Sequence, residues 1–565
     1  MWNWKKWLMV GILTGLAVFR FSGILNNPPS LFSDEVDEGY QAFVLNNCGT
    51  DYFGNKWPVH FQSFADFRTP LYIYSIAGLE RLGVGSELAV RLPSAIMGIV
   101  TIGGFFGLIM LVFNNYWLAV TGMVLLAINP WWWHFSRGGW EVVGMIMCLL
   151  WALICWLKYL DNKRIGWLLT GATLLAGSFY FYATAKMMAV ILGILQIIVW
   201  RKQTTKIDKK HLILGLAWLM LVSAPMIKDT LNGRAGYRFN YINIFSDPTN
   251  SKVVDGVRYQ DGLLMQKKDT VGIVPSAETK IAHNKLSLLV SKFGRNYLKA
   301  FSTDYLFLTG DGNLRHGFGS KGYLLYPDFI LVILGIGAVI FSKKYKNNLG
   351  TFMLGWLLLA PIPNALTRDS DFPNGTRLLL MLIPLMYLVV VGIKTIWNKK
   401  WLLAITLVTY GLSFADFYHY YSYHFPQIAP KEWHYGIKEA VNESIKLAQP
   451  DDKIYFSNSY EPVLPFFWFY NNYLPSSGSC VPAKALVKTS EFGFEGKSLE
   501  NKYYFGNFEW REMVKNRSSL ENKIFVINSK DMDQIKMLPG VKVDFLALPQ
   551  IKFTEQEKFW IIRLD

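Results

Sequence analysis

The chain has 565 residues, of which 52% are hydrophobic and only 17% are charged, whereas soluble proteins carry roughly 25% charged residues. This composition excludes an ordinary soluble enzyme, but a mean hydropathy of +0.21 is too low for a chain buried wholly in lipid, so a sizeable water-exposed part is expected. The net charge of +16 includes short basic runs between apolar segments, which is the positive-inside pattern of membrane proteins and not a nucleic-acid-binding patch.

Apolar segments long enough to cross a bilayer as helices recur along the chain. The candidate spans are 7–25, 88–113, 116–134, 139–159, 165–182, 184–200, 211–227, 325–341, 349–363, 377–396 and 401–418. The first could pass for a signal peptide, but no small-residue cleavage site follows it and many more spans do, so we treat it as a membrane helix. The sequence therefore predicts an α-helical polytopic membrane protein with about eleven transmembrane helices.

The charges of the loops predict the orientation of these spans. If the N-terminus is cytoplasmic and each span crosses once, the short basic loops 158–164, 201–210, 343–346 and 399–400 all lie in the cytoplasm. The segments expected outside are the acidic loop 26–87, the connector 131–141, the long segment 228–324, the loop 364–376 and everything from about residue 419. The apolar stretch 70–83 is short and contains two charges, so we expect a helix at the membrane interface there.

The composition changes near residue 430. Residues 431–448 have helical periodicity, and four short apolar runs typical of strands follow at 451–458, 522–529, 541–548 and 558–564. We therefore predict a transmembrane domain over 1–418 and a small extracytoplasmic α/β domain over 419–565. Cys48 and Cys480 fall on the same predicted side, which leaves a bridge between them open as one alternative.

The first outside loop has a high density of acidic residues directly after a membrane span. The stretch FSDEVDEGYQAF contains four of them: Asp34, Glu35, Asp37 and Glu38. A solvated acidic loop is the alternative explanation. However, the later stretch SFADFRTPLYIY sets Asp66 and Arg68 among aromatic and apolar residues before a proline. Charges held at a lipid boundary are costly, so these residues are candidates for a functional site.

Basic residues recur at the outer ends of the predicted spans: Arg91, Arg137, Lys186 and Arg377. Any one of them alone is explained as an interfacial anchor whose charged end reaches water. Together they place several cations on the same face as the acidic loop. That arrangement suits an anionic lipid headgroup, because Arg and Lys bind phosphate oxygens through charge-assisted hydrogen bonds.

An ordered series of motifs now carries a resemblance to a known family. In chain order they are DE with GYQAF, SFADFRTPLYIY, RLPSA, HFSRGGWE, FYFYATAK, GDGNLRH and APIPNALT. The series, which covers roughly residues 1–400, resembles the bacterial branch of glycosyltransferase family 39, of the GT-C superfamily. That branch is similar to protein O-mannosyltransferases and to the aminoarabinose transferases that act on lipid A.

The resemblance implies a transferase that uses a polyprenyl-phosphate sugar as donor at the outer membrane–water boundary. Asp34 would act as general base toward the acceptor hydroxyl, and Asp66 would support the acceptor or the base. Glu35, the other acid of the DE pair, is also a candidate catalytic residue. Relatives often read DEAxxGYNAY where this chain reads DEVDEGYQAF, and the added Asp37 and Glu38 leave open which acid is the base. A single displacement with one base would invert the anomeric centre.

The same resemblance implies two further sets of site residues. The cations expected to bind the donor phosphate are Lys186, Arg137, Arg68 and Arg377. The residues expected to contact the acceptor or the sugar are Tyr40, Trp140, Glu141 and Tyr182. The family pattern requires no metal ion or other cofactor, although paired carboxylates such as Asp34 and Glu35 would suit Mg²⁺ or Mn²⁺.

The expected partners are a polyprenyl-phosphate sugar and an acceptor that is a protein, a glycan or a lipid, with no nucleic acid. The resemblance favours the plasma membrane of a bacterium. Two other functions were weighed. A transporter or lipid flippase predicts ionisable or Gly/Pro-broken segments near mid-membrane in paired halves, whereas the notable charges here gather at one face. A non-catalytic membrane scaffold would need no acidic loop.

Overall fold

The computed structural model describes residues 4–64, 66–233, 241–265, 273–368, 373–476, 478–515, 520–547 and 558–564. The chain divides into two compact units. The first unit comprises Met1–Val100, Trp133–Gly144 and Ala415–Asp565, and the second comprises Thr101–Trp132 and Met145–Phe414. The first unit therefore combines segments from both ends of the sequence.

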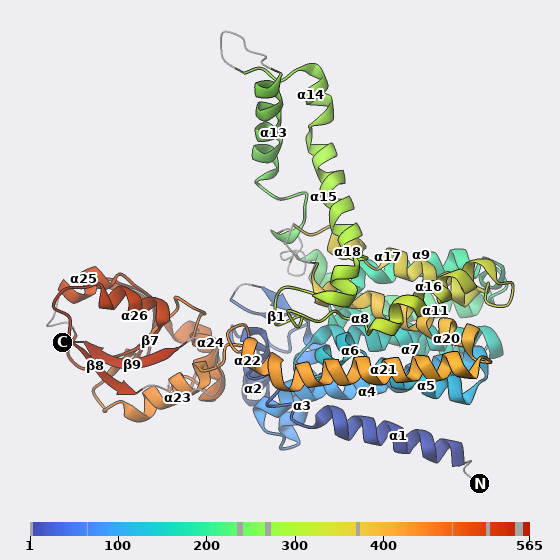
Figure 1. The fold of residues 1–565 in the computed structure, drawn as a ribbon. Helices are drawn as coiled ribbons and strands as arrows, with labels where there is room; N and C mark the ends of the chain where they lie inside the picture. Colours follow the sequence, from blue (N-terminus) through green and yellow to red (C-terminus); the bar gives the residue numbers. More distant parts are fainter. Residues whose placement is uncertain are drawn as a thin grey trace. The chain divides into compact units, whose positions relative to one another are not determined.

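Each of the eleven predicted spans contains a helix (Figure 1). In chain order these are α1 (Trp4–Phe21), α4 (Ser86–Phe113), α5 (Tyr116–Ile128) with α6 (Pro130–Phe135), α7 (Glu141–Asn162), α8 (Ile165–Phe181), α9 (Ala185–Val199), α11 (Lys209–Leu231), α16 (Tyr326–Phe341), α17 (Asn348–Leu359), α19 (Gly375–Leu378) with α20 (Leu382–Ile396), and α21 (Lys400–His419). Among the described residues, five helical runs are long and apolar enough to cross a membrane: Ser86–Phe113, Glu141–Asn162, Lys209–Leu231, Gly375–Ile396 and Lys400–Ile428. The helical multi-pass architecture is confirmed, and the number eleven stays a prediction.

Close helix packing in the second unit depends on small residues. Helix α16 packs along α20, and a Cβ added at Gly335 would lie 2.1 Å from the carbonyl oxygen of Leu388. Only a residue without a side chain allows two helix backbones to approach this closely, which is the usual means of helix association in membranes. In the described part of the predicted outside segment 228–324, the helices are α13 (Asn250–Leu264), α14 (Ala277–Ala282) and α15 (Lys285–Lys299), together with the end of α11 and a short π-helix.

The C-terminal part of the first unit is a mixed sheet with helices on both faces. Its seven strands have the order β4-β5-β6-β3-β7-β9-β8, parallel where β3 pairs with β6 and β7 and antiparallel elsewhere. The strands are β3 (Lys453–Ser457), β4 (Leu486–Glu491), β5 (Phe494–Leu499), β6 (Tyr503–Phe508), β7 (Lys523–Asn528), β8 (Val543–Ala547) and β9 (Phe559–Leu564). Figure 1 shows α25 (Trp510–Lys515) and α26 (Ser529–Lys536) on one side of the sheet and α23 (Ile437–Leu447) on the other. The predicted helix and four predicted strands are all present, but β4, β5 and β6 were not predicted.

The acidic stretch of the sequence forms helix α2 (Ser33–Cys48), which packs against α3 (Pro70–Arg81) and α24 (Leu464–Tyr470). A Cβ added at Gly39 would lie 2.4 Å from the Phe469 ring, so the absence of a side chain sets how closely α24 approaches. Cys48 forms a disulfide with Cys480. Helix α2 is thus held to the C-terminal part of its own unit by packing and by a covalent bond. Of the alternatives that the sequence left open for these two cysteines, the bridge is the one that forms.

Candidate active site

Helix α2 begins at the residues that the sequence singled out. Phe32 is its N-cap, and the Glu35 carboxylate accepts the backbone N–H of Phe32 at 3.1 Å, as in a capping box. Asp34 and Glu35 thus occupy the first turn, where the helix dipole favours negative charge. Adjacent residues of a helix point about 100° apart, so these two carboxylates have different surroundings.

Asp34 belongs to a group of carboxylates around one guanidinium, which we call the acid cluster: Asp34, Asp37, Glu38 and Arg68. Arg68 reaches it from a two-residue strand, β2 (Phe67–Arg68), which pairs with β1 (Phe61–Gln62). The Arg68 guanidinium lies 2.7 Å from Asp34 Oδ1, pairs also with Asp37, and lies 4.0 Å from Glu38 Oε1. Hairpin and helix therefore bring together charges that are 34 residues apart in the sequence.

Exposure separates Asp34 from the rest of the acid cluster. Its side chain is 47% exposed, whereas those of Asp37, Glu38 and Arg68 are 6%, 1% and 11% exposed. The Tyr52 hydroxyl also donates to Asp37 at 2.8 Å, so Asp37 is held by two partners. Asp34 is the carboxylate of this cluster that an incoming molecule can reach.

Glu38 lies at the buried end of the acid cluster, near Glu141 at the start of α7. Burial raises the pKa of Glu38 well above its ordinary value, and the neighbouring Glu141 carboxyl raises it further. Two carboxyl groups in one buried site favour sharing a proton, because both cannot be charged without cost. Glu38 is therefore suited to hold a proton.

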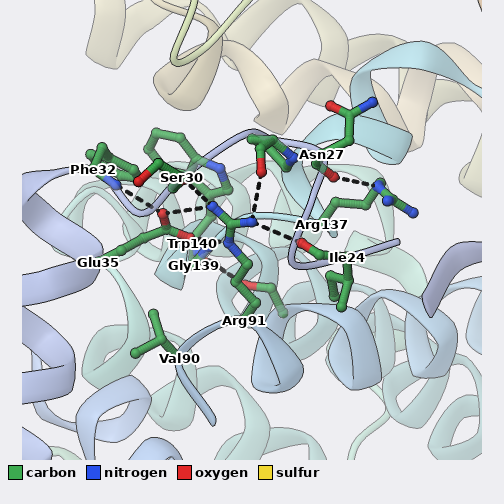
Figure 2. Close-up of polar contacts among 12 residues, drawn as sticks. Ile24, Asn27, Ser30, Phe32, Glu35, Val90, Arg91, Arg137, Gly139 and Trp140 are labelled. Carbon is green, nitrogen blue, oxygen red and sulfur yellow. Dashed lines mark hydrogen bonds and ion pairs between the residues drawn. The ribbon is translucent and has the colours of Figure 1, made fainter. Parts of the chain in front are cut away.

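Glu35 forms a separate, fully buried ion pair with Arg91 (Figure 2). Arg91 Nε donates to Glu35 Oε1 at 2.9 Å and Nη2 donates to Oε2 at 3.2 Å, and the backbone N–H of Gly139 donates to Oε1 at 2.7 Å. The other N–H groups of Arg91 donate to the backbone carbonyls of Ile24, Pro28 and Ser30. Arg91 thus holds the loop before α2, and both oxygens of Glu35 are engaged within the protein.

Arg137 holds the same loop in a similar manner. Its guanidinium donates to the backbone carbonyls of Arg20, Ser22 and Asn27 and lies 5.7 Å from the Trp133 ring centroid. Figure 2 shows it directed at Asn27. These hydrogen bonds thus tie this predicted phosphate ligand to the backbone, the Trp133 ring and the Tyr421 side chain add further contacts, and Arg137 is a buried cation next to the site.

Asp66, Tyr40 and Trp140 lie in the first unit as well. The Asp66 carboxylate accepts the N–H of Phe67 at 2.8 Å in the turn that joins β1 to β2. Tyr40 is buried and its hydroxyl donates to the Tyr473 carbonyl at 2.8 Å. Trp140 stacks on Phe32 with ring centroids 4.9 Å apart. Tyr40 and Trp140 therefore pack around helix α2, and Asp66 shapes the hairpin that presents Arg68.

Lys186, Tyr182 and Arg377 lie in the second unit. Lys186, at the start of α9, donates to the Thr230 hydroxyl at 3.1 Å, and Tyr182 is the C-cap of α8. Arg377 donates to the Thr367 hydroxyl at 3.3 Å. Beside it, the motifs GDGNLRH and APIPNALT meet the loop that precedes α19: Gly375 N–H donates to Asp311 at 2.9 Å, and Asn374 N–H donates to Asn364 at 3.3 Å.

Within the described parts of the chain, no three His, Cys, Asp or Glu side chains are placed to hold a metal ion. The possible use of Mg²⁺ or Mn²⁺ stays a prediction. The sequence did not single out three features of the site: the Glu35–Arg91 pair, the Tyr52–Asp37 hydrogen bond, and the packing of α24 on α2. Each joins residues that only the folded chain brings together.

Comparison with known proteins supports the resemblance. A family model described as dolichyl-phosphate-mannose-protein mannosyltransferase matches residues 68–227. The structure resembles the crystal structures of ArnT from Cupriavidus metallidurans in the apo state (TM-score 0.52, 11% identity, covering 98% of this chain and 97% of that one) and bound to undecaprenyl phosphate (TM-score 0.51, 11% identity, covering 98% of each chain). No curated protein matches the sequence. The chain therefore has the fold of ArnT, and the resemblance to the GT-C glycosyltransferases is confirmed.

Proposed function

We propose that the chain is a membrane glycosyltransferase that moves a sugar from a polyprenyl-phosphate donor to an acceptor hydroxyl on the extracytoplasmic face. The observation that carries the proposal is the half-exposed Asp34 carboxylate held 2.7 Å from the otherwise buried Arg68 guanidinium. This pair sets a proton acceptor next to a phosphate-binding group. The family match and the ArnT fold support the same class of reaction, and ArnT itself was crystallised with undecaprenyl phosphate.

In the proposed reaction, Asp34 takes the proton of the acceptor hydroxyl. The acceptor oxygen then attacks the anomeric carbon of the donor, and the bond from that carbon to the phosphate oxygen breaks. The electron pair leaves with the polyprenyl phosphate, and the configuration at the anomeric carbon inverts. Positioned proton transfer of this kind contributes about 10²–10⁴-fold to a rate.

Arg68 is proposed to bind the phosphate of the donor. It already holds Asp34, Asp37 and Glu38 nearby, so a phosphate oxygen that replaces Asp34 as its partner would free the base when the donor arrives. The roles of Lys186 and Arg377 as further phosphate ligands rest on the sequence resemblance. Arg137 is proposed to contribute its positive charge from its buried position beside the loop.

Glu35 is proposed to position the site and not to act as the base. Both of its oxygens are occupied by Arg91 and by backbone N–H groups, which leaves no lone pair directed at an acceptor. Asp66 is proposed to act through the hairpin that carries Arg68. Glu141 is proposed to hydrogen-bond Glu38, and Tyr182 remains a proposed contact of the sugar.

We place the region 419–565 outside the plasma membrane and the N-terminus in the cytoplasm. The disulfide between Cys48 and Cys480 supports this arrangement, because such bonds persist in oxidising compartments and are rare in the cytosol. Both cysteines lie in parts of the chain that the charges of the loops predict to be outside.

The test supplies a labelled polyprenyl-phosphate sugar to the purified protein and measures release of the polyprenyl phosphate. Asp34→Asn should abolish turnover while leaving the fold intact, and Lys186→Ala should raise the KM for the donor. Asp255→Asn, at an aspartate on α13 that is 74% exposed, is the matched control and should be fully active. Turnover by Asp34→Asn at the wild-type rate would exclude Asp34 as the base.

A further inference from the structure

A cavity of about 710 Å³ lies on the sheet of the first unit, beside the hairpin that carries Arg68. It is formed by β4, β5 and β6, by the tip of that hairpin, and by the segment 458–465 that leads into α24. We call it the strand cradle, and the lining residues used below are Phe64, Lys488, Glu495, Lys497, Phe505 and Asn507. Nothing in the proposed transfer reaction uses these side chains.

Two lysines lie side by side on the sheet face that lines the strand cradle. Lys488 on β4 is directly opposite Lys497 on β5 in the antiparallel register, which brings their Cβ atoms to about 4.5–5.5 Å. Like charges directly opposite each other destabilise a sheet. Part of this repulsion is offset where Lys497 lies 4.7 Å from the Phe64 ring centroid. The Glu495 carboxylate, two residues before Lys497 on the same face, offsets a further part, and a bound anion between the two ammonium groups would offset what remains.

The other residues of the strand cradle suit a sugar ring. Glu495 is opposite Asn507 on the same face of the sheet, and Lys497 is opposite Phe505. Carboxylate and amide groups can bind several hydroxyls, while the 39%-exposed Phe64 ring offers an apolar surface. A pocket that combines aromatic surface with a few polar groups is typical of small-molecule sites, and its volume falls within their usual range.

A chain of contacts leads from the strand cradle to the acid cluster. The Phe64 ring lies 5.4 Å from the Tyr52 ring, and the Tyr52 hydroxyl donates to Asp37 at 2.8 Å. Asp37 in turn pairs with Arg68. Phe64 and Arg68 are also on the same hairpin, four residues apart. A molecule bound in the cradle would therefore lie next to the structure that positions Asp34.

From these observations we propose that the strand cradle binds an acidic saccharide, which is the part of the acceptor next to the hydroxyl that receives the sugar. The opposed lysines bind its carboxylate or phosphate group, and the Phe64 face and the Glu495–Asn507 pair bind its rings. The identification of this saccharide as part of the acceptor rests on the proposed function. Binding of the saccharide does not itself require that any sugar is transferred.

The experiment measures binding of tri-galacturonic acid to the full-length protein in detergent by calorimetry, with maltotriose as the neutral saccharide. Tri-galacturonic acid should bind at least about tenfold more tightly than maltotriose. Each of Lys488→Gln and Lys497→Gln should lose about tenfold or more of that affinity, because each removes a charge-assisted hydrogen bond. Lys484→Gln, just outside the cradle, is the control and should bind as the wild type does.

Several outcomes would overturn the proposal. The first is that the wild type does not bind tri-galacturonic acid, and the second is that it binds both saccharides with equal affinity. The third is that both lysine variants keep the wild-type affinity while their unfolding midpoints equal that of the wild type. Tighter binding of a tri-glutamate peptide would assign the cradle to acidic peptides instead. Asp34→Asn protein that still binds tri-galacturonic acid but transfers no sugar would support both proposals, whereas binding by a wild type that transfers no sugar would support only the cradle.

Discussion

Replacing Glu35 should lower the stability of the folded protein. Replacing its neighbour Asp34 should stop the reaction and leave the stability nearly unchanged. The two carboxylates are adjacent in the sequence, and either could be the base on that ground alone. Their surroundings differ, because the Glu35 side chain is 0% exposed and paired with the equally buried Arg91, whereas that of Asp34 is 47% exposed.

The size of each effect follows from these surroundings. Glu35→Gln removes the charge that balances Arg91 in a buried site, and breaking a buried ion pair by altering one partner costs about 3–5 kcal/mol. It also replaces an acceptor oxygen by an amide donor that faces N–H groups. Asp34→Asn removes one exposed partner from Arg68, which keeps the Asp37 carboxylate as an ion-pair partner and the Glu38 carboxyl group nearby, so the loss should stay below about 1 kcal/mol.

The assay is unfolding by denaturant of each purified variant in the same detergent, combined with release of polyprenyl phosphate by the folded fraction. Glu35→Gln should shift the unfolding midpoint strongly and should retain activity per folded molecule. Asp34→Asn should unfold like the wild type and be inactive. The reasoning is refuted if Glu35→Gln is as stable as the wild type but inactive, since Glu35 would then be the reacting carboxylate.

Three further predictions concern the surroundings of helix α2. The pKa of Glu38 is higher in the folded than in the unfolded protein, so the folded protein binds a proton that the unfolded one has lost, and its stability falls as the pH rises through the folded pKa. Glu38→Gln should therefore reduce the difference in melting temperature between about pH 5 and about pH 8. An unchanged difference would contradict the assignment. Cys48→Ser should cost about 2–4 kcal/mol, and a reductant should lower the melting temperature of the wild type but not of this variant. Gly39→Ala should cost about 1–3 kcal/mol through overpacking against α24, whereas Gly78→Ala on α3, where an added Cβ has no neighbour within 4 Å, should cost nothing; equal melting temperatures for the two variants would refute the packing argument.

The helices could be predicted because their signal is local. A run of about 20 apolar residues is visible in the sequence whatever the rest of the chain does, and every predicted span contains a helix. Strands β4 to β6 lacked such a signal. Their residues, such as the Lys-, Gly- and Ser-containing β5 (Phe494–Leu499), do not alternate cleanly between apolar and polar, so the two-residue period that indicates a strand is missing.

The candidate site was predictable in kind but not in detail. The density of acids and the isolated Arg68 indicated where charges would meet, and the structure brings Asp34 and Arg68 into contact. The sequence could not show which of two adjacent carboxylates faces inward, because that depends on how α2 is rotated against α3 and α24. Nor could it show that Arg91 would pair with Glu35, 56 residues earlier in the chain.

The bond between Cys48 and Cys480 joins residues 432 positions apart. During synthesis, the first cysteine leaves the ribosome long before the second has been translated. The first cysteine must therefore wait for its partner until most of the chain has been translated. Maturation of this protein would then end with an oxidation step, and the cell's thiol-oxidising machinery would help to decide how much of it acquires its finished form.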